Sequence, residues 1–166
     1  MTTAEFREFV RSREEWFRGR LPESEASFEN VEQRLGVRLP ESLRWLLTEF
    51  GYWHGTGVSN LEDSVTQTLL ARRHLQLPIR YVVLENHHDG GLILLDTGDE
   101  TSPGECAVYG WIGAEDLGSD MELHDSTRLD SFGAYVANRL TAEQSLIDPR
   151  WVRYDPADSP EGRGEV

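Results

Sequence analysis

Residues 81–112 constrain the fold of this chain more than any other stretch. Three apolar runs rich in β-branched and aromatic residues follow one another there, at 81–84, 92–95 and 106–112. Asp89-Gly90-Gly91 separates the first two runs, and glycines supply the positive φ angles with which a chain folds back between antiparallel strands. Pro103 and Gly104 mark the second connection. The pattern predicts a three-stranded antiparallel meander.

Apolar residues at helical spacing flank this meander on both sides. They predict a helix over 3–18, a second with Phe28, Val31 and Leu35 on one face that stops at Gly36, a third from Pro40 to Phe50 and a fourth over 63–74. A last helix is predicted to be capped by Asp130 or Ser131. Thr2 and Glu5 fit a capping box, and Gly36 fits a left-handed helix end. The fold class is therefore α+β, with a twisted, mainly antiparallel sheet and helices packed as a layer over one of its faces. We also expect a helical turn near 114–117 and an edge strand at 151–154.

A chain of 166 residues is long enough to bury roughly 70% of the surface that its unfolded form exposes. We expect one domain over 1–154, with a disordered tail at 155–166, where Pro, Asp, Ser and Gly dominate. No run approaches the ~20 apolar residues of a membrane span, and no secretory segment follows Met1. The single cysteine, Cys106, is typical of a reducing compartment, so we expect a cytoplasmic protein.

The charge of the chain is strongly unbalanced. The net charge is −14, and every basic side chain is an arginine. Residues 96–130 carry ten acidic side chains against Arg128 alone, a local net charge of −9. Such a block repels nucleic acid and anionic lipid, and it attracts basic proteins by long-range steering. The alternative interpretation, that the charge only keeps loops soluble, stays open.

Two short motifs could carry hydrolytic or metal chemistry. Asp96-Thr97-Gly98 after an apolar strand is similar to the aspartic-protease triplet, in which two carboxylates share one proton. The chain has no second such triplet, so a turn is the favoured interpretation and a hydrolase using Asp96 the alternative. His87-His88-Asp89 could bind a divalent metal, but adjacent residues of a strand point to opposite faces. We interpret them as solvated residues of the hairpin.

Two further segments invite a functional interpretation. Tyr52-Trp53-His54-Gly55 could line a ligand pocket, although an aromatic loop that closes one end of the core is favoured. Cys106 lies on a predicted buried strand and is expected to be an inert core thiol. The sequence has no phosphate-binding glycine loop, no nucleophile elbow and no dinucleotide fingerprint. We therefore expect no enzyme activity, no cofactor and no metal.

The order of the motifs resembles a known superfamily. Glu32-Gln33-Arg34-Leu35-Gly36-Val37-Arg38-Leu39-Pro40, followed by a helix ending at Phe50-Gly51, is similar to the E-x-x-L-G-x-x-L-P … G signature of the SUKH superfamily. That superfamily includes the Smi–Knr-type cell-wall-assembly-regulator domains. The similarity continues through the meander and closes at Ser131-Phe132, so that it covers residues 24–140. Gly90-Gly91 replaces the Gly-Asp that is frequent in the family, which leaves the subgroup open.

The resemblance implies an α+β domain that acts as an immunity protein of a bacterial polymorphic toxin system. Such proteins bind a cognate toxin, often a nuclease or a nucleic-acid deaminase, and block it without catalysis. Combined with the charge, this predicts a basic toxin as the partner, and neither nucleic acid nor membrane. The predicted contact residues are Asp96, Asp99, Glu100, Trp111, Glu115, Asp116, Asp120 and Glu122. A non-catalytic regulatory scaffold or peptide-binding module of the cell-wall-regulator type is the alternative.

Overall fold

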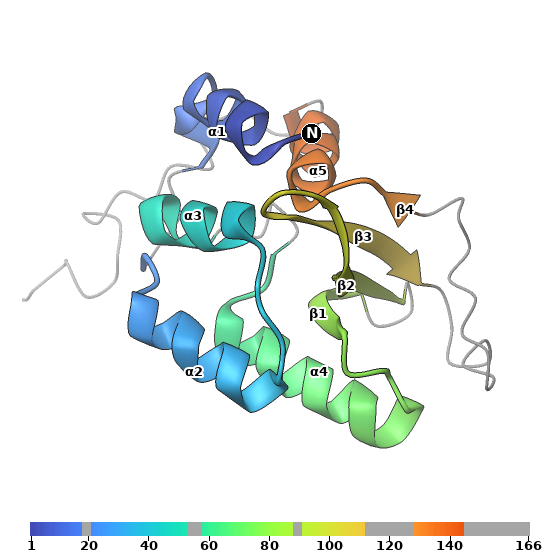
Figure 1. The fold of residues 1–166 in the computed structure, drawn as a ribbon. Helices are drawn as coiled ribbons and strands as arrows, with labels where there is room; N and C mark the ends of the chain where they lie inside the picture. The colour runs from blue at the N-terminus through green and yellow to red at the C-terminus, as the bar shows by residue number, and fades with distance from the viewer. Residues whose placement is uncertain (18–20, 53–57, 88–90, 112–127, 145–166) are drawn as a thin grey trace, which may run out of the picture.

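A computed structural model describes residues 1–17, 21–52, 58–87, 91–111 and 128–144 (Figure 1). The helices of this part are α1 (Thr3–Arg11), α2 (Glu25–Leu35), α3 (Glu41–Phe50), α4 (Leu61–Leu75) and α5 (Phe132–Gln144), with a 3₁₀ turn, η1 (Glu14–Trp16). The strands are β1 (Tyr81–Asn86), β2 (Leu92–Ser102), β3 (Glu105–Trp111) and β4 (Arg128–Leu129). They form one antiparallel sheet in the order β1-β2-β3-β4, which confirms the α+β class and the meander.

Both faces of the sheet bury apolar side chains. Val82 pairs with Leu95, and Leu95 pairs with Val108, so these three residues share the face that joins the main core. The opposite face carries a second, smaller cluster, to which Val83 and Leu94 belong. The prediction that helices cover only one face was therefore incomplete. A strand that is buried on both faces has a continuous run of apolar residues in its sequence, whereas a strand that is buried on one face alternates apolar and polar residues. Residues 81–84 of β1 form such a continuous run.

The main core lies between the helices and the first face of the sheet. Its largest fully buried side chains come from four helices, two strands and the 3₁₀ turn region, and include Phe6, Phe17, Phe28, Leu35, Leu47, Leu84, Leu95, Phe132 and Leu140. Phe6 of α1 meets Trp45 of α3 and Phe132 of α5 edge-to-face, with ring centroids 6.0 and 5.9 Å apart. These contacts fix α1 against α3 and α5 at the top of Figure 1.

The outer edge of β1 is covered by α4 and the segment before it (Figure 1). The Thr68 hydroxyl accepts the backbone N–H of Val83 at 2.9 Å and donates to the Ser64 carbonyl at 2.6 Å. The N–H of Ser59 donates to the Leu84 carbonyl at 2.9 Å. Backbone groups that an edge strand would otherwise offer to another chain are thus bonded within the molecule.

Several predicted helix ends are confirmed. Thr2 and Glu5 form the capping box, Gly36 adopts the left-handed conformation with φ 68°, and the Ser131 hydroxyl caps α5 by accepting the Ala134 N–H at 2.9 Å. Pro40 was predicted as the first residue of its helix. In the structure it is the N-cap of α3, one position before the helix begins at Glu41.

Two predicted helices have different bounds. The helix predicted over 3–18 ends at Arg11, because the Ser12 hydroxyl bonds the Phe9 carbonyl and competes with the helical pattern. The helix predicted over 63–74 spans Leu61–Leu75, because Asn60 caps it by accepting the Asp63 N–H. The helical turn near 114–117, the strand at 151–154 and the tail at 155–166 lie outside the described residues. In the described part, no helix has the length and apolarity to cross a membrane.

Candidate functional site

The segment between α2 and α3 is held by the carboxylate of Glu32. One oxygen of this carboxylate accepts the backbone N–H of Leu39 and a guanidinium N–H of Arg44, both at 2.9 Å. Leu35 and Leu39 are buried, and Gly36 turns the chain between them. A second nitrogen of Arg44 pairs with Glu25, so its guanidinium is occupied on two sides. The E-x-x-L-G-x-x-L-P motif is thus a local device that fixes the start of α3.

The tip of the β2–β3 hairpin lies against the same place. The Gly104 carbonyl accepts the N–H of Glu41 at 3.0 Å, and the Gly104 N–H donates to the Glu100 carboxylate at 3.1 Å. Gly104 has φ 79°, and a Cβ built on it would lie 3.0 Å from the Glu41 Cβ and 3.1 Å from the Thr3 hydroxyl. Only glycine allows the hairpin to approach α1 and α3 this closely.

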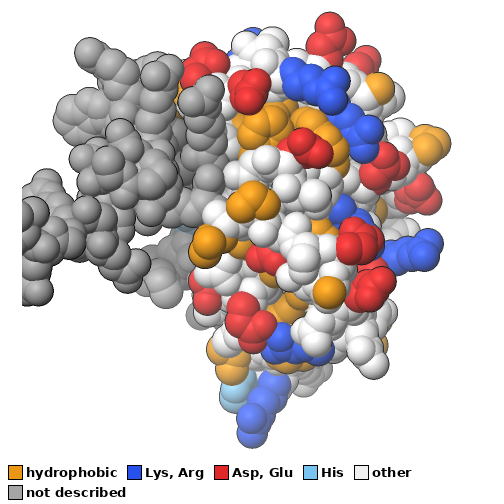
Figure 2. Space-filling model, turned by 90° about the vertical axis from the view of Figure 1, so that its left-hand side faces the viewer, with side chains coloured by type: hydrophobic (Ala, Val, Ile, Leu, Met, Phe, Trp, Pro, Cys, Tyr) orange, Lys and Arg blue, Asp and Glu red, His pale blue; other side chains and the backbone are white. Residues whose placement is uncertain are grey.

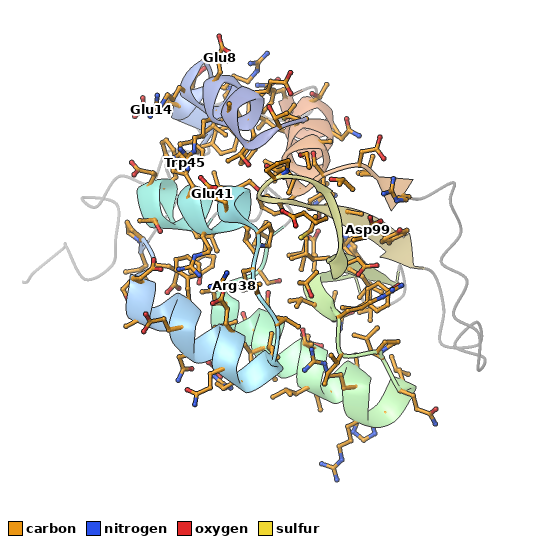
Figure 3. All side chains as sticks on the ribbon, in the orientation of Figure 1. Glu8, Glu14, Arg38, Glu41, Trp45 and Asp99 are labelled. Atoms are coloured by element: carbon orange, nitrogen blue, oxygen red, sulfur yellow. The ribbon has the colours of Figure 1, made fainter. Side chains whose placement is uncertain are left out.

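A hollow of about 390 Å³ lies between these two supports, and it is the candidate site. We call it the motif–hairpin hollow. One wall is the segment from Arg38 to Arg44, and the other is formed by residues of the hairpin, including Thr97, Glu100 and Cys106. Figure 3 shows Arg38 before α3 and Glu41 at its first turn, on the same side of the molecule.

Glu105 lines this hollow and is a carboxylate without exposed surface. It accepts hydrogen bonds from the hydroxyls of Ser42 (3.0 Å) and Thr3 (3.1 Å), and from the N–H of Gly133 (3.4 Å). Burial raises its pKa, and these three donors partly oppose the shift. No described arginine or histidine forms an ion pair with it. One side chain therefore joins α1, α3, α5 and β3 without a cation.

Cys106 also lines the hollow and is buried, as predicted. Burial, followed by the charges of the surrounding carboxylates with Glu100 and Glu105 first, raises the pKa of its thiol to about 11. The thiol is therefore protonated near neutral pH and is a poor nucleophile. The electrostatic environment at this wall of the hollow is negative.

The structure corrects the prediction that Asp96 is a surface contact. Its side chain is buried, with the residue only 1% exposed. Its carboxylate lies 3.4 Å from the Arg80 guanidinium and accepts the Gly98 N–H at 3.0 Å. The aspartate of the protease-like triplet therefore lies within strand β2 as a paired, structural group.

Asp99 is also paired within the molecule. Its carboxylate lies 2.9 Å from the Arg128 guanidinium and accepts the Tyr109 hydroxyl at 3.2 Å. Arg128 pairs with Asp130 as well, so the one basic residue of the acidic block contacts two of its carboxylates and the three side chains together keep one negative charge. Figure 3 shows Asp99 on the strand side of the molecule, apart from Glu41.

The other predicted contact residues divide into two groups. Glu100 is exposed and lines the motif–hairpin hollow. Trp111 ends β3, and the orientation of its side chain is not described. Glu115, Asp116, Asp120 and Glu122 lie outside the described residues. On the face shown in Figure 2, acidic and basic side chains are interspersed, and the acidic ones are the more frequent.

The remaining candidates have structural roles where they are described. His87 lies 3.1 Å from the Glu85 carboxylate, and no group of three or more potential metal ligands occurs in the part of the chain that the structure describes. The Tyr52 hydroxyl bonds Glu23 and accepts the Leu61 N–H at 2.7 Å, which secures the start of α4. His88, Asp89 and residues 53–57 lie outside the description.

Arg38, Glu41 and Glu105 belong to one site that the sequence did not predict. Arg38 and Glu41 flank the Leu39-Pro40 pair of the motif, which was a signal for their position. Glu105 is one of the ten acidic side chains of residues 96–130, but it was not among the predicted contact residues. Nothing in the sequence indicates that it points between the helices.

The comparisons with known proteins identify the motif segment and the sheet as parts of one family pattern. The model of the SMI1 / KNR4 family (SUKH-1) matches residues 22–138, which include α2, α3, α4 and the complete sheet. The matched range also contains both walls of the motif–hairpin hollow. No curated protein matches the chain.

Proposed function

The chain belongs to the SMI1 / KNR4 family (SUKH-1), and from that membership we propose that it is an immunity protein that binds and neutralises a cognate toxin domain. The family match over residues 22–138 is the observation that carries this proposal. The protein acts by occupying the toxin's surface, without chemistry of its own.

The charge of the chain supports a basic toxin as the partner. Nucleases and nucleic-acid deaminases hold phosphate backbones and are therefore rich in basic residues. A partner with a net charge of −14 is drawn to such a surface at long range, and this attraction raises the association rate more than the affinity. The toxin is accordingly a basic nuclease or nucleic-acid deaminase.

The proposed contact surface includes Glu100, the exposed carboxylate at the motif–hairpin hollow. Trp111, Glu115, Asp116, Asp120 and Glu122 extend it along the chain. Asp99 stays in the proposed surface, because its side chain is 36% exposed although it pairs with Arg128, whereas Asp96 is left out because it is only 1% exposed.

Co-expression tests the proposal directly. The neighbouring reading frames are searched for a toxin domain, that domain is expressed in bacterial cells with and without the protein, and growth is measured. We expect growth to be restored only when the protein is present, and the two proteins to co-purify as one complex. A protein that neither restores growth nor binds the domain would refute the proposal.

The same experiment distinguishes the regulatory scaffold. A scaffold of the cell-wall-regulator type binds several partners weakly, so a pull-down would return many polypeptides and no dominant basic one. An immunity protein returns one tightly bound partner, whose association slows as salt is added.

A further inference from the structure

We propose that the motif–hairpin hollow receives a cationic side chain, an arginine or a lysine, of the partner protein. This inference rests on the proposed function and specifies its contact. Three features of the structure support it: the shape of the hollow, the charges that line it, and the buried carboxylate of Glu105.

The hollow has the dimensions and the walls for one long side chain. Its volume of about 390 Å³ exceeds that of any single side chain, and Leu39 and Pro40 supply apolar surface for a methylene stem. Both walls are fixed: Glu32 holds Leu39, and the Gly104 carbonyl holds the start of α3 at Glu41. Because both walls are already ordered before binding, little binding free energy is lost in ordering them.

The charges inside the hollow favour a cation. Arg44 lines it, but its guanidinium is occupied by Glu25 and Glu32. Glu100 and Glu105 form no ion pair with any described residue, although both accept hydrogen bonds. The carboxylates of Glu100 and Glu105 also act on the neighbouring thiol of Cys106 and raise its pKa.

Arg38 does not reverse this balance. It lines the hollow but is exposed, and it forms no ion pair or hydrogen bond with another described residue. Water and salt screen an exposed charge far more than a buried one, and this applies to the exposed carboxylate of Glu100 as much as to Arg38, so that these two opposite charges largely offset each other. The buried carboxylate of Glu105 therefore contributes more to the field inside the hollow than the exposed guanidinium at its rim.

Glu105 also provides a reason for the cation to bind. A buried carboxylate without a cation is costly, which is why burial raises its pKa. A guanidinium or ammonium group in the hollow would stabilise the ionised form. Binding is thus expected to release part of a proton at a pH where Glu105 is partly protonated, and to tighten as pH rises through that range.

The test uses the full-length protein and a small probe. L-Argininamide is titrated into the isotope-labelled protein, and amide chemical shifts are followed by NMR. L-Citrullinamide, which has nearly the same shape without the side-chain charge, is the matched control probe. We expect the arginine probe to shift residues 38–44 and 97–106 with millimolar affinity, and the citrulline probe to bind about fivefold more weakly or not at all.

Two variants complete the test. Glu100→Gln keeps an acceptor for the Gly104 N–H and removes only the charge, so we expect the arginine probe to bind about threefold to fivefold more weakly. Glu29→Gln, at an exposed position of α2 outside the hollow, is expected to bind as the unmodified protein does. Equal shifts with both probes, shifts confined to other residues, or equal binding by both variants would overturn the inference.

The outcome is separable from that of the proposed function. If the protein protects cells from the toxin but the probe does not bind in the hollow, only this inference fails. If the probe binds but no toxin is neutralised, the hollow is a cation-binding site and the proposed function fails.

Discussion

Glu32 accepts the backbone N–H of Leu39, seven residues further along the chain, at 2.9 Å. This bond closes the turn that Gly36 begins, and it directs the chain into α3. The same carboxylate oxygen accepts a hydrogen bond from Arg44, one turn into that helix. The beginning and the end of the family motif are therefore linked by one charged side chain, which positions a wall of the motif–hairpin hollow.

We expect Glu32→Ala to lower the free energy of unfolding by about 2 kcal/mol, because the Leu39 N–H and the Arg44 guanidinium lose their shared acceptor. Glu32→Gln retains an acceptor and is expected to cost less than half of that. Urea denaturation measures both. Glu29→Ala, at an exposed position of the same helix, is the control and should change stability by less than about 0.5 kcal/mol. A loss at Glu32 no larger than that of the control would contradict the assigned role.

We expect Glu105→Gln to change how stability depends on pH. Burial raises the pKa of Glu105 in the folded protein above the value of 4.5 that applies to the unfolded chain. At a pH between the unfolded and the folded pKa, the folded protein therefore holds a proton that the unfolded chain has released. The contribution of this group to stability is therefore greatest at low pH and declines as pH rises through the folded pKa. Glutamine does not titrate and avoids that decline.

Denaturation of both proteins from pH 5 to pH 8 checks this expectation. The stability of Glu105→Gln relative to the unmodified protein should rise with pH. Parallel stability curves would show that Glu105 titrates alike in the folded and unfolded states.

Gly104 and Gly36 form a matched pair of glycine-to-alanine tests. Both have positive φ angles, 79° and 68°, so alanine is strained at each by about 1 kcal/mol. At Gly104 the new Cβ also meets the Glu41 Cβ at 3.0 Å, whereas nothing lies within 4 Å at Gly36. We expect Gly104→Ala to be the more destabilising by a further 1–2 kcal/mol or so, measured by thermal or urea unfolding. Equal losses would mean that the hairpin tip moves away without cost.

We expect the charge reversal Glu100→Arg to slow association with a basic toxin domain and to weaken protection of co-expressing cells. Glu100 is exposed, and its replacement places a positive charge beside Arg38 at the rim of the hollow. Stopped-flow association at two salt concentrations measures the effect, which should diminish as salt screens the charges. Glu29→Arg makes the same change in net charge elsewhere. A rate that falls equally for both variants would indicate general attraction instead of a contact at the hollow.

Local features of the fold were predictable because their causes are local. The capping box at Thr2 and Glu5 and the left-handed Gly36 each depend on residues within one helical turn. The bounds of α1 were wrong because Ser12 forms a competing bond with Phe9 that apolar spacing does not register. Burial of the second sheet face was missed because a continuous apolar run fits either one or two covered faces.

The candidate site could not be predicted by counting charges. A count gives no information on burial or pairing, and Asp96 is neutralised by Arg80, which lies outside the acidic block. Glu105 belongs to the block in sequence but lies between helices that come from both ends of the chain. Thr3, Ser42 and Gly133 lie around Glu105 only once the whole chain has folded, so no local sequence pattern indicates this arrangement.

The bonds that Val83 and Leu84 form with Thr68 and Ser59 bear on how much of this protein a cell can hold. An inhibitor of the proposed kind has to be present in excess before its target is made, and at high concentration the open strand edges of identical chains can pair with one another. With the outer edge of β1 already occupied at these positions, copies of the molecule have one site fewer at which to polymerise. A threonine hydroxyl in the middle of a helix thereby helps to keep a standing reserve of the protein in solution.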